Sequence, residues 1–275
     1  MDLDATGKTS FDHIYTEPDP RAYFSALRGL DYQIPELAKP YFAKLIQEYR
    51  QTQGVAVPQV LDIGCSYGIN AALLRCDATM DELYTHYTDP AVTALDRDGL
   101  LAVDRAMVRS RDQLDGVRFV GFDASAPALA YAHAAGYLED TVHADLEAGD
   151  PTPEQRARLS GTDLVISTGC VGYVTEATLT RVAAAQDGPL PWMAHFVLRM
   201  FPYTRVADAL SDLGYDTVHV EGAFKQRRFA SAEEQAQVLD TIAEAGVDPT
   251  GLESEGWLYA ELHLSRPRGA TPPRA

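Results

Sequence analysis

The chain has 275 residues, of which 46% are hydrophobic and 23% charged, and its formal net charge at pH 7 is −17. This composition is that of a globular protein, and the length is enough for one α/β domain with additions. A large negative charge argues against partners that are held through phosphate groups. We therefore expect neither nucleic acid nor a membrane surface as a partner.

The cysteines, the histidines and the N-terminus bear on the cellular setting. The three cysteines, Cys65, Cys76 and Cys170, are odd in number and far apart, which implies no disulfide framework. No histidine pattern typical of a zinc site is present, so we expect no metal. The acidic N-terminus does not resemble a signal peptide, and no stretch approaches the about 18 apolar residues of a membrane span. These features predict a cytoplasmic protein.

The predicted elements alternate between helices and strands along the chain. The first 40 residues are rich in Pro and Tyr and are expected to form only short helical pieces, before a helix that begins at Tyr41. Strands are predicted over residues 60–63, 117–122, 141–145, 162–167, 192–200, 215–220 and 257–264. Helices are predicted over residues 71–74, 126–135, 176–185, 206–213 and 231–246, the last opening with a capping box. This alternation indicates an α/β fold with a doubly wound, mostly parallel sheet of seven strands.

The most informative stretch is the turn that follows the strand over 60–63. Glycines at such a turn let the backbone approach a ligand and present amide groups at a helix N-terminus. The G-x-G-x-x-G template of dinucleotide-binding proteins matches only at Gly64. A second template, acidic-x-G-x-G-x-G, matches Asp62, Gly64 and Gly68, with Ser66 in place of the middle glycine.

This second template resembles motif I of the class I methyltransferases, which bind S-adenosylmethionine. The segment that ends in Asp123 is similar to the second motif of that family, in which an acidic residue binds both ribose hydroxyls, as a carboxylate can. Asp145 and Leu146 stand where the family commonly has an acid near the adenine amino group, and the strand that ends at Thr168 resembles the one that lines the methionine moiety. The resemblance implies a cofactor site made of Asp62, Gly64, Cys65, Ser66, Gly68, Asp123, Ala124, Asp145, Leu146 and Thr168.

The resemblance extends from Val60 to Leu264, and besides Ser66 in place of the middle glycine it departs from the family in one larger respect. Asp123 lies much farther beyond Gly68 than the about 20 residues usual for such an acid. Residues 77–117 are therefore expected to be a helical insertion; otherwise Asp123 is only an acid at the end of a strand.

The resemblance also implies a domain organisation. Residues 1–55 are expected to form an N-terminal helical cap, 56–266 the Rossmann-like methyltransferase domain with an antiparallel strand near the C-terminus, and 267–275 a flexible tail. The aromatic run with Tyr15 and Tyr23 looks like a cap over the methyl donor, although a structural latch would have the same composition.

Candidate catalytic residues are few, because methyl transfer needs alignment and at most one base. Tyr173, which follows the fourth strand, could orient the acceptor or be a half-buried aromatic residue. His195 could be a base or a hydrogen-bonded histidine of the core. Arg199, Arg227 and Arg228 could bind a carboxylate of the substrate or be isolated charges.

One further segment, from Thr6 to Ser10, hints at a phosphate-binding loop but lacks its first glycine and a preceding strand. We therefore expect an S-adenosylmethionine-dependent methyltransferase that acts on a small-molecule acceptor. Two alternatives use the same fold: another reaction of the sulfonium, such as cyclisation or aminopropyl transfer, or a non-catalytic ligand-binding subunit.

Overall fold

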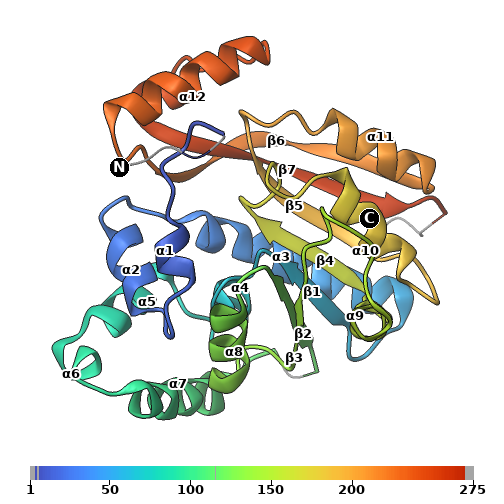
Figure 1. Cartoon of the computed structure of the whole chain (residues 1–275). Helices are drawn as coiled ribbons and strands as arrows, with labels where there is room; N and C mark the ends of the chain where they lie inside the picture. The colour runs from blue at the N-terminus through green and yellow to red at the C-terminus, as the bar shows by residue number, and fades with distance from the viewer. Residues whose placement is uncertain (1–3, 5, 115, 270–275) are drawn as a thin grey trace.

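The computed structural model of the protein describes residues 4, 6–114 and 116–269. Its strands are β1 (Gln59–Ile63), β2 (Arg118–Asp123), β3 (Asp140–His143), β4 (Leu164–Thr168), β5 (Trp192–Leu198), β6 (Tyr215–Arg228) and β7 (Trp257–Pro267). They form one seven-stranded sheet in the order β3-β2-β1-β4-β5-β7-β6 (Figure 1). The five strands from β1 to β5 are parallel, and β7 runs antiparallel to both β5 and β6. The predicted fold class is confirmed.

Helices cover both faces of the sheet because side chains alternate along each strand. On β1, Val60 joins one hydrophobic cluster, which α3 (Ile34–Gln53), α4 (Ile69–Arg75) and α8 (Ala126–Ala135) complete. Its neighbour Leu61 faces the other cluster, with α9 (Pro153–Leu159), α10 (Glu176–Ala184) and α11 (Thr204–Asp212). A smaller cluster holds α12 (Ala232–Glu244) against the ends of β5 and β7.

Three elements differ from the sequence prediction. The helix expected from Tyr41 begins at Ile34, because Pro35 lies in the first turn, where a missing N–H group costs little. The short helix α9, which the prediction omitted, begins after a capping box at Thr152. Strand β6 continues to Arg228 through two register shifts, whereas the prediction ended it near Val220. This longer strand matters because its second half reaches the candidate site.

The N-terminal cap and the segment 77–117 are helical and pack against each other. The cap contains α1 (Asp12–Tyr15) and α2 (Arg21–Arg28), and the segment contains α5 (Met80–Thr88), α6 (Pro90–Thr93) and α7 (Arg97–Arg111). The ring of Phe24 on α2 stacks on Tyr87 of α5, with 4.4 Å between the ring centroids. Between α5 and α7 the buried carboxylate of Asp104 accepts hydrogen bonds from Tyr87 and Tyr131. The segment therefore extends the cap.

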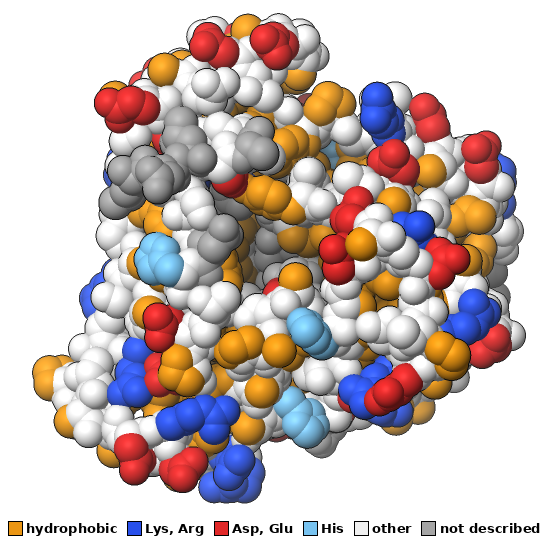
Figure 2. All heavy atoms as spheres, viewed as in Figure 1, with side chains coloured by type: hydrophobic (Ala, Val, Ile, Leu, Met, Phe, Trp, Pro, Cys, Tyr) orange, Lys and Arg blue, Asp and Glu red, His pale blue; other side chains and the backbone are white. Residues whose placement is uncertain are grey.

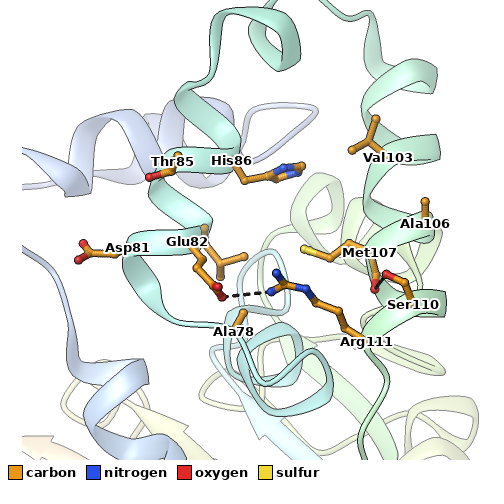
Figure 3. A pocket seen from close by; sticks show the side chains of 11 residues that line it. Ala78, Asp81, Glu82, Thr85, His86, Val103, Ala106, Met107, Ser110 and Arg111 are labelled. Atoms are coloured by element: carbon orange, nitrogen blue, oxygen red, sulfur yellow. Dashed lines mark hydrogen bonds and ion pairs between the residues drawn. The ribbon is translucent and has the colours of Figure 1, made fainter.

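A hollow lies between α5 and α7 (Figure 3). Residues of α5 and α7 line it, and the ion pair between Glu82 and Arg111, at 3.1 Å, spans it. Apart from Ala78, which precedes α5, the described residues that line this hollow all come from these two helices. It is therefore separate from the strand ends where the candidate site lies.

The C-terminal segment predicted as a tail starts at Pro267, which is the last residue of β7. Arg268 remains attached to the edge strand through its ion pair with Asp216, at 3.0 Å. Residues 270–275 lie outside the described residues. In the part of the chain that the structure describes, no helix is long and apolar enough to cross a membrane, and no cluster of three or more His, Cys, Asp or Glu residues could hold a metal ion.

Candidate functional site at the carboxyl ends of the parallel strands

The candidate site lies where the order of the strands reverses. From β1 the chain builds outward through β2 to β3, and it then returns to place β4 on the other side of β1. In open α/β sheets ligands bind in the crevice that forms at such a point. A cavity of about 640 Å³ lies here, between the strand ends and the N-terminal segment, and Figure 2 shows a hollow flanked by hydrophobic side chains on this face.

The glycine turn after β1 forms the floor of this cavity. Gly64 has a φ of 68°, and a Cβ atom there would lie 2.6 Å from Cβ of Cys170, so only glycine fits. Ser66 also adopts a left-handed conformation, with a φ of 51°, which explains why the template has glycine at that position. Gly68 lies outside the cavity, at the N-cap of α4, where a Cβ atom would lie 3.1 Å from Cβ of Ala132. Its role is close packing of α4 on α8.

The carboxylate of Asp123, at the end of β2, faces the cavity. Its two oxygens accept the backbone N–H groups of Ser66 and Ser125, each at 2.8 Å. A carboxylate has about four acceptor positions, so each oxygen can still accept one hydroxyl. Burial raises the pKa of Asp123, although the hydrogen bonds from Ser125 and Ser66 oppose this. Ala124 lines the cavity beside it.

Asp62 supports the cavity from beneath and does not line it. The side chain is fully buried, and its Oδ1 accepts a hydrogen bond from Nδ2 of Asn70 at 3.0 Å. The same amide reaches Oγ1 of Thr168 at 3.2 Å, which joins β1, α4 and β4. Burial raises the pKa of Asp62 to about 7, and the nearby charge of Asp123 contributes, against the hydrogen bond from Asn70. Thr168, Asn70 and Cys65 all line the cavity.

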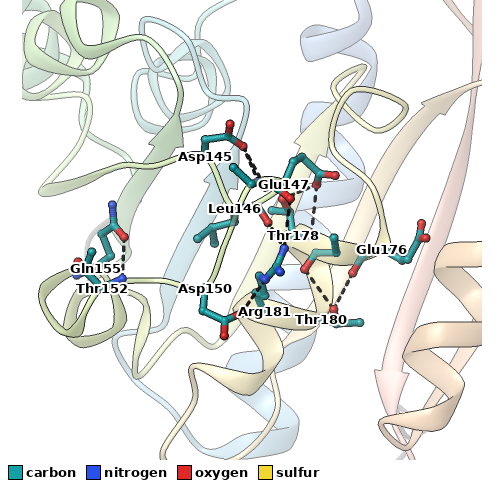
Figure 4. A network of polar contacts seen from close by, with 12 residues as sticks. Asp145, Leu146, Glu147, Asp150, Thr152, Gln155, Glu176, Thr178, Thr180 and Arg181 are labelled. Atoms are coloured by element: carbon teal, nitrogen blue, oxygen red, sulfur yellow. Dashed lines mark hydrogen bonds and ion pairs between the residues drawn. The ribbon is translucent and has the colours of Figure 1, made fainter.

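Asp145 and Leu146, expected at the adenine, do not line the cavity. The exposed carboxylate of Asp145 accepts the N–H groups of Glu147, at 3.0 Å, and Ala148, at 3.2 Å, which closes its own turn. Leu146 is buried in the core, and its carbonyl accepts a hydrogen bond from Arg181. Figure 4 shows how this loop is fixed to α10. A carboxylate that stabilises a turn and one that binds a ligand look the same in a sequence.

Tyr173 lines the cavity, as expected for a residue near an acceptor. Its hydroxyl donates a hydrogen bond to Asp4, and the Oγ1 of Thr6 lies 3.4 Å away. Burial raises the pKa of Tyr173, and the hydrogen bond to Asp4 adds to this effect, so the phenol stays protonated near neutral pH. Tyr173 therefore closes the cavity against the N-terminal segment.

His195 does not reach the cavity, and the structure places it in the core. The ring is fully buried, and its Nδ1 lies 2.7 Å from Oγ of Ser167. Burial lowers the pKa of His195 to about 3, with a contribution from His263 on the neighbouring strand. A neutral imidazole enclosed on β5 cannot exchange protons with a ligand at the strand ends. Of the two interpretations of this residue, the structure favours the core histidine.

The three arginines considered for a substrate carboxylate already have protein partners. Arg199 pairs with Glu253 at 2.5 Å, and Arg228 pairs with Asp31 at 2.6 Å. Arg227 lines the cavity, but its guanidinium holds the buried Glu234. None of the three offers an unpaired charge.

The sequence analysis considered some residues of the cavity wall and missed others. The aromatic run of the cap lies in this wall, through Tyr15, Tyr23 and Tyr32. Lys8, Asn70 and Gln226 also line the cavity and were not considered for a cofactor or substrate site. The only sequence signal for Lys8 was its place in the segment that hinted at a phosphate-binding loop. Gln226 had none, because the strand prediction ended before it.

Of the comparisons with known proteins, the one with solved structures found similar proteins. No family model matches the chain, and no curated protein matches it. A protein of unknown function from Deinococcus radiodurans R1 is 15% identical, with a TM-score of 0.43 over 86% of this chain and 88% of that one. A SAM-dependent methyltransferase from Aquifex aeolicus is 12% identical, with a TM-score of 0.42 over 94% and 99%. Magnesium protoporphyrin IX methyltransferase from Synechocystis PCC 6803, with bound SAM, is 11% identical, with a TM-score of 0.40 over 83% and 79%.

Proposed function

We propose that the protein binds S-adenosylmethionine in the cavity at the strand ends and transfers its methyl group to a small-molecule acceptor. The observation that carries the proposal is the carboxylate of Asp123. It lies at the end of β2 beside the glycine turn and retains one acceptor position on each oxygen. Two vicinal ribose hydroxyls are the donors that such a carboxylate fits.

The cavity fits the rest of this cofactor as well. The close approach of Gly64 to Cys170 keeps the turn after β1 free of a side chain, as a ligand that lies along the backbone requires. Buried side-chain oxygens of Ser66, Asn70 and Gln226 have no hydrogen-bond partner among the described residues. Buried polar atoms of this kind are normally satisfied, so a polar ligand accounts for them.

The residues of the chain have separate tasks in this proposal. Asp123 orients the ribose, the amide of Asn70 supports the turn from Asp62, and Tyr23 and Tyr32 cover the ligand and exclude water. When bound, S-adenosylmethionine supplies an electrophilic methyl group, which the acceptor takes with a lone pair while the electrons of the carbon–sulfur bond return to sulfur. Burial raises the pKa of Cys170 to about 12, so its thiol is not a competing nucleophile.

The binding half of this proposal is tested by calorimetry. S-adenosylhomocysteine and S-adenosylmethionine are titrated into the full chain, and we expect one site per chain for each. Absence of binding by both would refute the proposal at its first step.

The reaction is tested by following the methyl group. The protein is incubated with S-adenosylmethionine labelled in the methyl group and with a filtered extract of small metabolites. Label that appears on a small product supports methyl transfer. Methylthioadenosine that retains the label would instead indicate another reaction of the sulfonium, and binding without any turnover would indicate a ligand-binding subunit.

A further inference from the structure

A buried lysine enters the cavity from the N-terminal strap, which we define as residues 6–11. In Figure 1 the strap is the dark-blue loop that passes between α12 and α1. Gly7 has a φ of 83°, and a Cβ atom there would overlap Cγ of Gln237 on α12. Two residues later, the backbone N–H group of Thr9 donates a hydrogen bond to Oε1 of the buried Glu234 at 2.8 Å. These two contacts fix the strap on α12, and Lys8 between them lines the cavity.

The ammonium group of Lys8 has aromatic neighbours but, among the described residues, no carboxylate in direct contact. Its Nζ lies 4.6 Å from the ring centroid of Tyr173 and 5.8 Å from that of Phe201. Within residues 4, 6–114 and 116–269, no carboxylate lies within ion-pair distance of this nitrogen, although Lys8 is only 7% exposed. The carboxylate of Asp4 accepts hydrogen bonds from Thr6, Tyr173 and the backbone N–H of Lys8, and Asp4 and Glu234 act on the ammonium group only from beyond ion-pair distance.

Arg227 also lines the cavity and, unlike Lys8, has a carboxylate in direct contact. Arg227 donates to both oxygens of Glu234, at 2.9 and 2.6 Å, so its charge is compensated. Aromatic rings attract a cation but do not replace a counter-ion. A buried charge without a partner is unfavourable, and an anion placed beside it recovers the lost interaction. The wall is therefore prepared for a negatively charged group.

The position of Lys8 assigns that group to the acceptor rather than to the ribose end of the cofactor. Asp123 ends β2, whereas the two rings beside Lys8 follow β4 and β5. Because the strand order is β2-β1-β4-β5, Lys8 lies across β1 and β4 from Asp123. In-line transfer requires the acceptor to approach the methyl carbon opposite the carbon–sulfur bond, so the acceptor cannot occupy the ribose position beside Asp123.

We propose that Lys8 binds a carboxylate of the methyl acceptor, so that the substrate class is small carboxylic acids. This inference rests on the proposed function, because it is the cofactor that divides the cavity into a donor side and an acceptor side. This role of Lys8 also explains the segment that hinted at a phosphate-binding loop. In that segment Gly7 makes the close contact with α12, and Lys8 provides the charge.

Proton linkage gives an independent signature of this contact. Burial lowers the pKa of Lys8 to about 8, and the positive charge of Arg227 adds to the effect, whereas the acidic groups of Asp4, Glu234 and Cys170 act in the opposite direction. A bound carboxylate favours the charged ammonium and raises this pKa again. Between about pH 8 and pH 10, binding of an acid therefore takes up a proton, which calorimetry detects in two buffers with different heats of ionisation.

The test compares acids with their uncharged amides. Phenylacetate and phenylacetamide, benzoate and benzamide, and indole-3-acetate and indole-3-acetamide are titrated into the full chain saturated with S-adenosylhomocysteine. We expect at least one acid to bind about tenfold more tightly than its amide, and Lys8→Met to abolish this preference. Lys225→Met is the matched control, since this exposed lysine lies 4.6 Å from the ring centroid of Trp257, outside the cavity.

Further measurements separate the possible failures. Lys8→Arg keeps the charge and should keep the preference for acids, but without proton uptake at pH 9, because arginine does not titrate there. If Lys8→Met does not fold, proton uptake by the unmodified protein decides the question. Equal binding of every acid and its amide, or absence of acid binding, would overturn the assignment.

The cofactor is measured in parallel. Lys8→Met should bind S-adenosylhomocysteine within about threefold of the unmodified protein, and a loss of about tenfold or more would instead place Lys8 on the cofactor's own carboxylate. Failure of the unmodified protein to bind S-adenosylhomocysteine would refute the proposed function alone. The acid–amide comparison on the ligand-free protein would then still decide whether Lys8 forms an anion site.

Discussion

Replacement of Asp123 by asparagine tests the ribose site with little change in shape. The carboxylate accepts two backbone N–H groups and retains two acceptor positions, which we propose bind the ribose hydroxyls. In Asp123→Asn one oxygen becomes an NH₂ group, which faces donors on the protein and on the ligand. Hydrogen bonds to a charged acceptor contribute about 1.5–3 kcal/mol each, so the loss of one lowers the binding free energy by about 2–3 kcal/mol. We therefore expect the Kd of S-adenosylhomocysteine to rise about 30- to 150-fold.

Calorimetry at pH 7.5 measures this effect, and thermal unfolding checks that the variant is folded. Asp145→Asn is the matched control, because among the described residues this carboxylate accepts the N–H groups of Glu147 and Ala148 alone and does not line the cavity. Its Kd should stay within about threefold of that of the unmodified protein. The reasoning is refuted if Asp123→Asn binds as tightly as the unmodified protein, or if the two variants lose affinity equally.

Three further predictions concern the turn, the buried acid and the core histidine. Gly64→Ala should abolish calorimetric binding of S-adenosylhomocysteine. The control Gly54→Ala has a similar φ of 69° but open space around it, so it should cost only about 1 kcal/mol of stability and no affinity. Equal affinities of the two variants for S-adenosylhomocysteine would contradict the role of the turn after β1. Because the pKa of Asp62 is raised to about 7, the folded state binds a proton more readily than the unfolded state, and stability falls as pH rises from about 4 to about 7. Chemical denaturation should show that the free energy of unfolding falls by about 2–4 kcal/mol over this range relative to that of Asp62→Asn. Parallel pH profiles of the two proteins would contradict this prediction. The imidazole of His195 should not titrate by NMR between pH 5 and pH 8, since burial lowers its pKa to about 3; a shift in that range would return it to the candidate bases.

The sheet and its helices were predictable because their signal is local. Apolar runs marked β1, β2, β4 and β5, and Thr175, with Oγ1 that accepts the N–H of Ala177, marked the start of α10. The turn at Gly64 and the acid at Asp123 were found for the same reason, since each directly follows an apolar strand. In a parallel sheet such positions meet at one edge.

The rest of the site depends on contacts between distant segments. Lys8 lies in the cavity because Gly7 and Thr9 meet α12 more than 200 residues later in the chain, and nothing near Lys8 in the sequence encodes that contact. The capping box expected at Ser231 is formed only in part: Ser231 caps α12, but Glu234 turns to Arg227 and the strap. Local patterns locate strands and turns, whereas tertiary contacts decide which charges remain unpaired.

A crystal structure of the protein with S-adenosylhomocysteine tests the central claim most directly. The account predicts ligand density in the cavity over Gly64, with both ribose hydroxyls on the carboxylate of Asp123 and the vacated methyl position facing the side of Tyr173 and Lys8. Ligand density elsewhere, or a ribose that does not contact Asp123, would contradict it.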